Sequence, residues 1–386
     1  SDVIYTTALA LVSARQGDMP TAEQALASVK ATDIYHAGGR ALYEASLVEA
    51  YLADRQGQTE RCGAALARAF ALTRTIGIEF APMVSDTPGL MPRLCALALE
   101  QDIEVSAVRQ LIRNHGLHPP RPDTPAWPWP LRIRTLGQFV IERDDKALPA
   151  PRKEARKLHD LLKLLVASPR ATIATLAQTL WPDATGDNAK SLFDIAVHRL
   201  RKLLGHDGAV LVRSGEVSLD PTLVWTDVAA FDHVCAAIEA CVRSTEAPSE
   251  QLEQLEQLER RLLELYRGPF LTGDDELPPI IAARDRLRSR LQRHLAMLGE
   301  QHERSNRIDA AAAVYRRAIE QDVLAEEMYR RLIACHLKLD QPAEAFETYR
   351  RCRDNLSIIL GIKPTAETER LVARLRDGTS ANVAIA

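Results

Sequence analysis

The sequence lacks the features of a membrane or exported protein. Its 386 residues contain no continuous apolar run of about 18 residues, the length that a transmembrane helix requires. The first residues, SDVIYTTALALVSARQGD, show no basic segment followed by an apolar stretch and do not resemble a signal peptide. An initiator methionine is also missing, and we expect the sequence to be an excised fragment of a longer chain.

Paired cysteines are missing as well. The six cysteines are Cys62, Cys95, Cys235, Cys241, Cys335 and Cys352. None belongs to a Cys-x-x-Cys pair, and no nearby histidine completes a zinc pattern, so we expect no metal site. Scattered thiols most often fill the core, and they fit the reducing cytoplasm, where we expect the protein to work.

The motifs of common enzyme classes are absent too. The sequence has no GxxxxGK[ST], GxSxG or HExxH motif, and no glycine-rich loop joins a predicted strand to a helix. Glu253, Glu256 and Glu259 recur every three residues, which spreads them over a helix surface and does not pair them as acid and base. We therefore predict a protein that is not an enzyme, with no catalytic residues and no cofactor.

What remains is an ordinary globular composition with an uneven charge. The chain is 46% hydrophobic and 26% charged, and its length favours two to three domains. Residues 131–225 hold 15 Lys and Arg against 11 Asp and Glu, a net charge of +4, so the rest carries −7 of the total −3. A basic middle segment in an acidic chain suggests a nucleic-acid partner.

The N-terminal part reads as a helical repeat that ends at a proline-rich linker. The tripeptide RQG occurs at 15–17 and again at 55–57, each time before an alanine-rich amphipathic run. The 40-residue spacing predicts repeated helix pairs over residues 1–118. The segment HPPRPDTPAWPWP then holds six prolines, which exclude a helix and predict a stiff linker at 119–130.

The middle segment, 131–225, changes its periodicity. In LRIRTLGQFVIERDDKALP, alternation around Ile133 and Ile141 predicts a small antiparallel sheet with a turn at the two aspartates. KEARKLHDLLKLLVAS and TIATLAQTLWPD predict two helices, the second capped by Thr172 and ended by Pro182. A third helix follows at 188–205, and AVLVRSGEVSLD predicts a hairpin around its Ser-Gly pair.

The C-terminal part, 226–376, is predicted to be helical and repetitive. The tripeptide YRR begins at Tyr315 and at Tyr349, and Ala311 and Ala345 match at the same offset of 34 residues. That offset is the tetratricopeptide period. We predict tetratricopeptide-like helix pairs, followed by a disordered tail at 377–386.

The helix NAKSLFDIAVHRLRKLLG, residues 188–205, separates into two faces. Its predicted buried stripe consists of Phe193, Val197, Leu200 and Leu204. Its polar face carries Ser191, Asp194, His198, Arg201 and Lys202, with Arg199 at the edge. Such a helix is either a solvated scaffold element or one that places its cationic side in a DNA groove. Asp194 faces the same way, and it can pair with Lys190 or His198 within the helix or accept from a cytosine amino group.

The motif order resembles a known class of regulators. RKEARKLHDLLKLL, TLWPD, RLRKLLG and LVRSGEVSLD, behind a small sheet, resemble the OmpR-type winged helix. LYRGPFL, AARDRLRSRL and LGIKPTAET resemble the bacterial transcriptional activation domain that follows it in antibiotic regulatory proteins. The N-terminal helices resemble the end of a helical-repeat sensor. The resemblance implies a mainly α fold with a small β component, in which a winged helix-turn-helix is flanked by tetratricopeptide-like helical domains.

The resemblance also implies DNA-contacting residues. Arg199 and Arg201 are the first candidates for base contacts, although Arg199 lies at the edge of the polar face, and Ser191 and His198 come second. The candidates for phosphate or wing contacts are Lys190, Lys202, Arg213, Trp181, Thr172 and Lys153. Trp181 can equally belong to the core, and Lys153 lies in a basic run that can equally be a solvated helix face.

Two functions of different classes stay open at this point. The first is sequence-specific transcription activation, in which the 188–205 helix reads double-stranded DNA, the chain dimerises and its C-terminal domain contacts RNA polymerase. The second is a sensor or scaffold, in which the helical domains bind a small-molecule or protein effector and mask the winged helix. An acidic remainder beside a basic segment is compatible with such masking.

Overall fold

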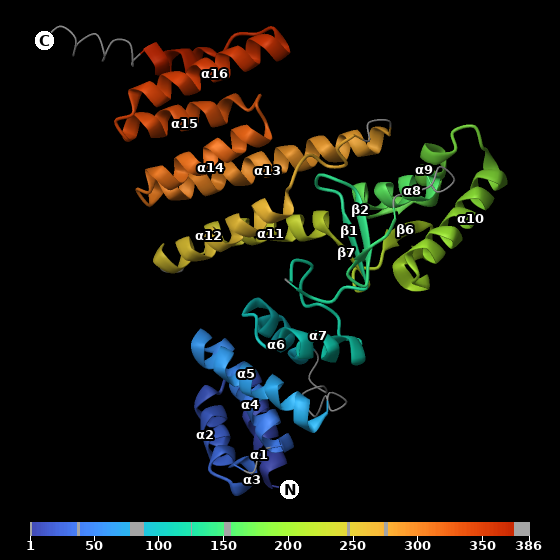
Figure 1. Ribbon diagram of the computed structural model, residues 1–386, viewed down its shortest axis with the longest axis vertical. Coiled ribbons are helices and arrows are strands. Elements are labelled where there is room, and N and C mark those ends of the chain that lie inside the picture. Colours follow the sequence, from blue (N-terminus) through green and yellow to red (C-terminus); the bar gives the residue numbers. More distant parts are fainter. Residues whose placement is uncertain are drawn as a thin grey trace, which may run out of the picture. The chain divides into compact units, whose positions relative to one another are not determined.

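The computed structural model describes residues 2–36, 39–77, 89–124, 126–149, 156–244, 248–273 and 277–373. The predicted fold class is confirmed, because the chain is mainly α-helical with a small β component (Figure 1). None of the helices in these ranges is long and apolar enough to cross a membrane. The elements group into two compact units. The first combines residues 1–131 with 143–146 and 221–225, and the second contains the remainder.

The first unit contains the helices of the N-terminal part of the chain. They are α1 (Asp2–Gln16), α2 (Met19–Lys30), α3 (Asp33–His36), α4 (Gly39–Arg55), α5 (Thr59–Ile76), α6 (Leu90–Glu100) and α7 (Val105–Asn114). Gly17 and Gly57 end α1 and α4 in the left-handed region, at φ 86° and 70°. In both turns the next amide donates to the carbonyl five residues back, at 2.9 Å and 2.8 Å. This is the Schellman closure, so the two RQG tripeptides mark the same helix–turn–helix geometry.

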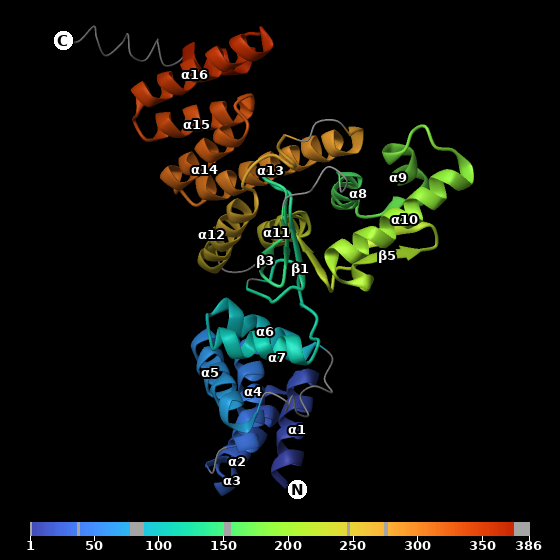
Figure 2. The ribbon, with the colours of Figure 1, turned by 45° about the vertical axis from the view of Figure 1, so that its right-hand side comes forward.

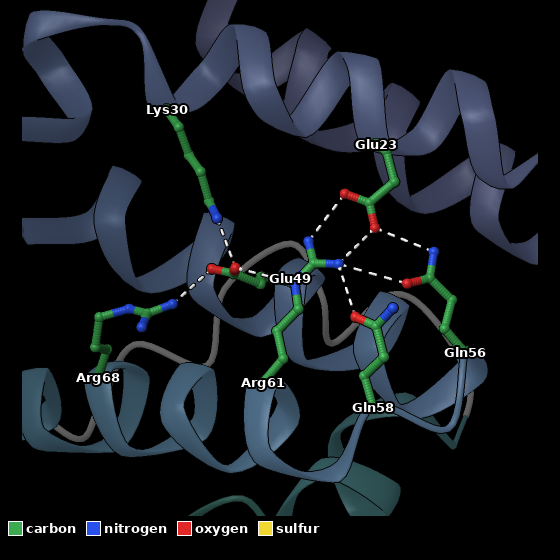
Figure 3. Close-up of polar contacts among 7 residues, drawn as sticks. All are labelled: Glu23, Lys30, Glu49, Gln56, Gln58, Arg61 and Arg68. Atoms are coloured by element: carbon green, nitrogen blue, oxygen red, sulfur yellow. Dashed lines mark hydrogen bonds and ion pairs between the residues drawn. The ribbon is translucent and has the colours of Figure 1, made fainter.

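A polar cluster joins three of these helices. Glu49 on α4 is only 5% exposed, and its carboxylate accepts from Lys30 at 2.6 Å, Arg68 at 2.6 Å and Arg61 at 3.3 Å (Figure 3). The Arg61 guanidinium also forks onto Glu23 of α2, at 2.7 Å and 2.9 Å. Burial by itself would raise the pKa of Glu49, but the three cations outweigh it and hold this pKa below its usual range. The cluster therefore holds α2, α4 and α5 together through charge.

The proline-rich segment contains no helix among its described residues, as its prolines predict. Its two tryptophans are nevertheless buried, since Trp127 is 2% exposed and Trp129 is 3% exposed. The segment thus packs on the folded protein through its aromatic side chains.

The middle part of the chain has the predicted order of a sheet, three helices and a hairpin. Strands β1 (Leu131–Arg134), β2 (Val140–Arg143), β3 (Lys146–Ala147) and β7 (Val224–Thr226) form a sheet in the order β3-β2-β1-β7. The elements between β3 and β7 are α8 (Arg156–Ala167), β4 (Ala171–Thr172), α9 (Ile173–Leu180), α10 (Gly186–Leu204), the 3-10 turn η3 (Asp207–Ala209), β5 (Val210–Arg213) and β6 (Glu216–Leu219). The second sheet has the order β4-β6-β5.

The C-terminal helices stack in chain order. They are α11 (Asp227–Arg243), α12 (Pro248–Leu265), α13 (Pro278–Arg304), α14 (Ile308–Gln321), α15 (Glu326–Lys338) and α16 (Pro342–Leu360), of which α13 to α16 lie in successive layers (Figure 1). Asn306 and Asp340, 34 residues apart, adopt φ values of 57° and 58° in equivalent turns. The amides that follow them donate to His302 and His336 carbonyls at 2.8 Å and 2.9 Å, so the 34-residue period is a structural repeat.

Close helix packing depends on one small residue in this stack. Gly299 of α13 faces Tyr315 of α14, and a Cβ atom at Gly299 would lie only 2.3 Å from the tyrosine ring. The Tyr315 hydroxyl donates to Glu303 at 2.8 Å, which fixes the ring over the glycine.

The six cysteines are buried free thiols, in agreement with their interpretation as core-filling side chains.

One carboxylate fixes the end of β1 to the helical part of the second unit. Asp227, the first residue of α11, is 2% exposed and accepts from the amides of Thr135 and Leu136 at 2.6 Å and 2.7 Å, and from the Thr135 hydroxyl at 2.8 Å. Beside it, Leu136 forms an antiparallel bridge with Phe270, and the Leu271 amide donates to the Thr135 carbonyl at 2.7 Å. The residues that follow β1 thus pair with the loop between α12 and α13.

A second contact joins α8 to α13. The Arg286 guanidinium of α13 donates to the Ala167 carbonyl at the end of α8, at 3.1 Å. The last carbonyls of a helix lack intrahelical partners and carry the negative end of its dipole, so a cation is favoured there. The segment that contains α8, α9 and α10 and the C-terminal helices therefore belong to one compact unit.

We expect Asp227→Ala to lower the free energy of unfolding of the second unit by about 2–4 kcal/mol, because two buried amides and a hydroxyl lose their acceptor. Denaturant unfolding of the full chain measures this loss. Asp285→Ala is the matched control, since that carboxylate is 60% exposed and, among the described residues, pairs with Arg288 on its own helix. Equal losses for the two variants would show that Asp227 does not hold the strand.

Glu49→Gln should loosen the first unit by about 2 kcal/mol, because three cations lose their shared partner. A carboxyl whose pKa is lowered on folding stabilises the fold above its ordinary pKa of about 4.5, and this stabilisation disappears as the pH falls through the folded-state value. Hydrogen exchange of α4 and α5, corrected for intrinsic rates, should therefore accelerate below about pH 4.5 in the wild type and depend less on pH in the variant. Glu60→Gln, an exposed change on α5, should leave both properties as they are.

Candidate nucleic-acid interface

The helix α10 buries the stripe that its periodicity predicts. Phe193, Leu200 and Leu204 are fully buried, and Ala196 and Val197 are 4% exposed. The helix ends at Gly205, which adopts φ 77° and donates to the Arg201 carbonyl at 2.9 Å. This apolar stripe fixes the rotation of α10 on the domain and thereby decides which side chains face outward.

The opposite face of α10 is polar and available for binding. Its exposed side chains include Lys190, Ser191, Asp194, His198, Arg199 and Lys202. Across the part of the chain that the structure describes, none of these six side chains takes part in a hydrogen bond or an ion pair. The intrahelical pairing considered for Asp194 is therefore not found there, which leaves its carboxylate free to accept from a ligand.

The two arginines of the RLRK motif have different environments. Arg201 is half-buried, and its Nη2 and Nε atoms donate to the Val210 carbonyl at 2.6 Å and 3.2 Å. Val210 begins β5, so this fork ties the end of α10 to the hairpin. Arg199 is exposed and its donors are free among the described residues. The helical periodicity made Arg199 the weaker of these two candidates, because it lies at the edge of the predicted polar face, whereas in the described part of the structure Arg199 has free donors and Arg201 is bonded to the hairpin.

The hairpin lies beside α10 (Figure 2). Its strands pair in register from Val210 opposite Leu219 to Arg213 opposite Glu216. Ser214 and Gly215 form the two-residue turn at φ 51° and 82°, which is the mirror-image turn that a Ser-Gly pair predicts. Arg213 is exposed at the tip, where a wing residue would stand.

The remaining candidates differ in what they contact. The Thr172 hydroxyl accepts from the Thr175 amide at 3.1 Å, which confirms the predicted cap of α9. Trp181 is partly buried and ends α9 through its amide, which donates to the Ala177 carbonyl at 2.8 Å. Lys153 lies outside the described residues. Lys157 of the same basic run donates to the Leu180 carbonyl at 2.7 Å, so it joins α8 to α9.

Sequence reasoning missed an apolar residue on the outward face. Ile195 is 47% exposed, and polar residues such as Ser191, His198 and Arg199 lie next to it on α10. On the hairpin, Val212 is 40% exposed. The signal was present in the sequence, because Ile195 lies two residues after Phe193 and must therefore point away from the buried stripe.

Comparison with known proteins assigns part of the chain. Residues 226–376 match the family model of the bacterial transcriptional activator domain. The comparison with curated proteins gives no match. A similar solved structure is Mycobacterium tuberculosis EmbR in complex with a low-affinity phosphopeptide, at 21% identity and a TM-score of 0.49. The match covers 64% of this chain and 65% of EmbR, so it spans less than two thirds of that protein.

A second similar structure is the assembly chaperone of RpL4 (Acl4, residues 1–338), at 12% identity and a TM-score of 0.24, with 98% of this chain and 97% of that one covered. Among the resemblances that the sequence motifs indicated, the one to the bacterial transcriptional activator domain is confirmed, and it extends over α11–α16.

Proposed function

We propose that the protein is a sequence-specific DNA-binding transcription activator that reads the major groove with α10. The observation that carries this proposal is the outward face of α10, which is exposed, presents three cations against one carboxylate and is unpaired among the described residues, while the opposite face closes the core. A single α-helix fits the major groove, where each base pair presents a distinct set of donors and acceptors.

Each exposed side chain then has a chemically suitable target. The Arg199 guanidinium can donate two hydrogen bonds to guanine O6 and N7, and Ser191 and His198 can contact neighbouring base edges. The free carboxylate of Asp194 can accept from a cytosine amino group. Lys190 and Lys202 are suited to phosphates, which fix the position of the protein without reading sequence.

The hairpin acts as the wing in this proposal. Arg213 at its tip would enter the adjacent minor groove, where narrow A·T tracts attract arginine. Arg201 has a positioning role, because its bonds to Val210 set the distance between the reading helix and the wing. Trp181 and Thr172 would brace the backbone beside the phosphates.

The family match supports activation. A bacterial transcriptional activator domain at 226–376 would supply the surface that contacts RNA polymerase. One reading helix contacts few base pairs, so we propose that the protein binds repeated half-sites as a homodimer or a tandem pair. The bonds of Asp227 and Arg286 would keep the DNA-reading helices and the activation domain in a fixed relation.

A second candidate function is sensing by the N-terminal helices. One observation favours it, because α1 exposes four large apolar side chains: Ile4, Tyr5, Leu9 and Val12. Such a stripe is typical of a helix that packs on a protein partner or on a neighbouring repeat. In this case an effector bound there would control the access of α10 to DNA.

Selection of bound duplexes from a random pool with the full chain, followed by affinity measurements at several salt concentrations, tests the proposal. The logarithm of the binding constant should fall steeply and linearly with the logarithm of the salt concentration, because phosphate contacts release counterions. If the full chain enriches no duplex and retards none, the proposed function is wrong.

Arg199 and Arg201 provide a matched pair of variants on that selected duplex. Arg199→Ala should cost about 1–3 kcal/mol of binding and relax the preference at one base pair. Arg201→Ala should weaken binding to all duplexes alike, because it releases the hairpin without removing a base contact. Lys202→Ala should also act uniformly and reduce the salt slope by about 1. Relaxed preference in Arg201→Ala alone would reverse the roles of the two arginines.

A further inference from the structure

The outward face of α10 contains one residue that does not suit a solvated surface. Ile195 is 47% exposed, and its neighbours one turn away are Ser191, Leu192, His198 and Arg199. Three of these neighbours are exposed and polar and Leu192 is partly buried, so Ile195 is an exposed apolar side chain beside the polar face of α10.

Neither packing nor helix formation explains this isoleucine. The core side of α10 is closed by residues that are at most 4% exposed, such as Phe193 and Leu200. Isoleucine is also a weaker helix former than alanine, lysine, glutamate or glutamine, each of which would suit a solvated position better. A residue that serves neither purpose is suited to an apolar ligand at that place.

The same property recurs on the neighbouring element. Among the described residues from 156 to 225, the large hydrophobic side chains that are exposed are Ile195 on α10 and Val212 on β5. These are the two elements that the proposed function brings to DNA. Single exposed apolar residues are common on proteins, but here they coincide with the proposed contact surface.

We propose that Ile195 is a specificity-determining residue that packs on the 5-methyl group of a thymine. This inference rests on the proposed function of α10. The thymine methyl is the apolar feature of the major-groove edge, and aliphatic side chains recognise it by contact. Because Ile195 and Arg199 are four residues apart, their Cβ atoms are about 5–6 Å apart. The thymine therefore lies within about two base steps of the guanine that Arg199 reads, given about 3.4 Å per step.

Uracil substitution tests this contact atom by atom. The full chain is bound to its selected duplex, and each thymine near the Arg199 position is replaced in turn by uracil, which removes the methyl group and keeps every hydrogen-bonding atom. The wild type should lose about fourfold in affinity at one position, the loss expected when one buried methyl group is removed. In Ile195→Ala the thymine and uracil duplexes should bind equally.

Two variants serve as controls. Val212→Ala removes a comparable exposed apolar side chain from the hairpin and should keep the uracil effect at that position. Ile195→Val keeps part of the contact and should show a reduced uracil effect. Thermal unfolding of Ile195→Ala should match the wild type, since the side chain is outside the core.

The outcomes separate this inference from the proposed function. If the wild type binds its duplex but tolerates uracil everywhere, or if Ile195→Ala keeps the full uracil effect, the thymine contact is wrong and DNA binding by α10 still stands. If no duplex is bound at all, the proposed function itself fails, and the inference fails with it.

Discussion

The carboxylate of Asp227 is the contact on which the second unit depends. Two amides and a hydroxyl from the end of β1 converge on this buried group, 92 and 91 positions before it in the chain. Burial raises the pKa of Asp227 although the donors favour its charged form. The carboxyl group has a structural role there, because no apolar side chain could accept from these backbone donors. It thereby fastens the chain that follows β1 to the first turn of α11.

Local chemistry made much of this fold predictable. The buried stripe of α10 follows from its 3.6-residue period, the hairpin from a Ser-Gly pair, and the cap of α9 from Thr172. The turns that recur at spacings of 40 and 34 residues were readable because each contains a residue in the left-handed region, Gly17 and Gly57 or Asn306 and Asp340. Each of these signals lies within a few residues of the structure that it predicts.

The candidate site was less predictable, because its decisive contacts are tertiary. The helical periodicity places Arg201 on the polar side of the helix. It cannot predict that the Arg201 guanidinium donates to the Val210 carbonyl, because that contact forms only when the hairpin packs beside the helix. The ion pairs of Glu49 likewise join three helices that only folding brings together. Ile195 was readable in principle, but a search for polar contacts passes over an apolar residue. The OmpR-type assignment of the middle segment and its site residues stay predictions.

The fork from Arg201 to Val210 also has an evolutionary consequence. The link between α10 and the hairpin is made by a side chain distinct from the exposed ones, so under the proposed function residues 191, 195, 198 and 199 are separate from the contact that sets the distance between helix and hairpin. If α10 reads DNA as proposed, exchanges at these four positions would alter the operator sequence and leave that contact in place. A designer who wished to retarget the protein would randomise the same positions and leave the fork intact.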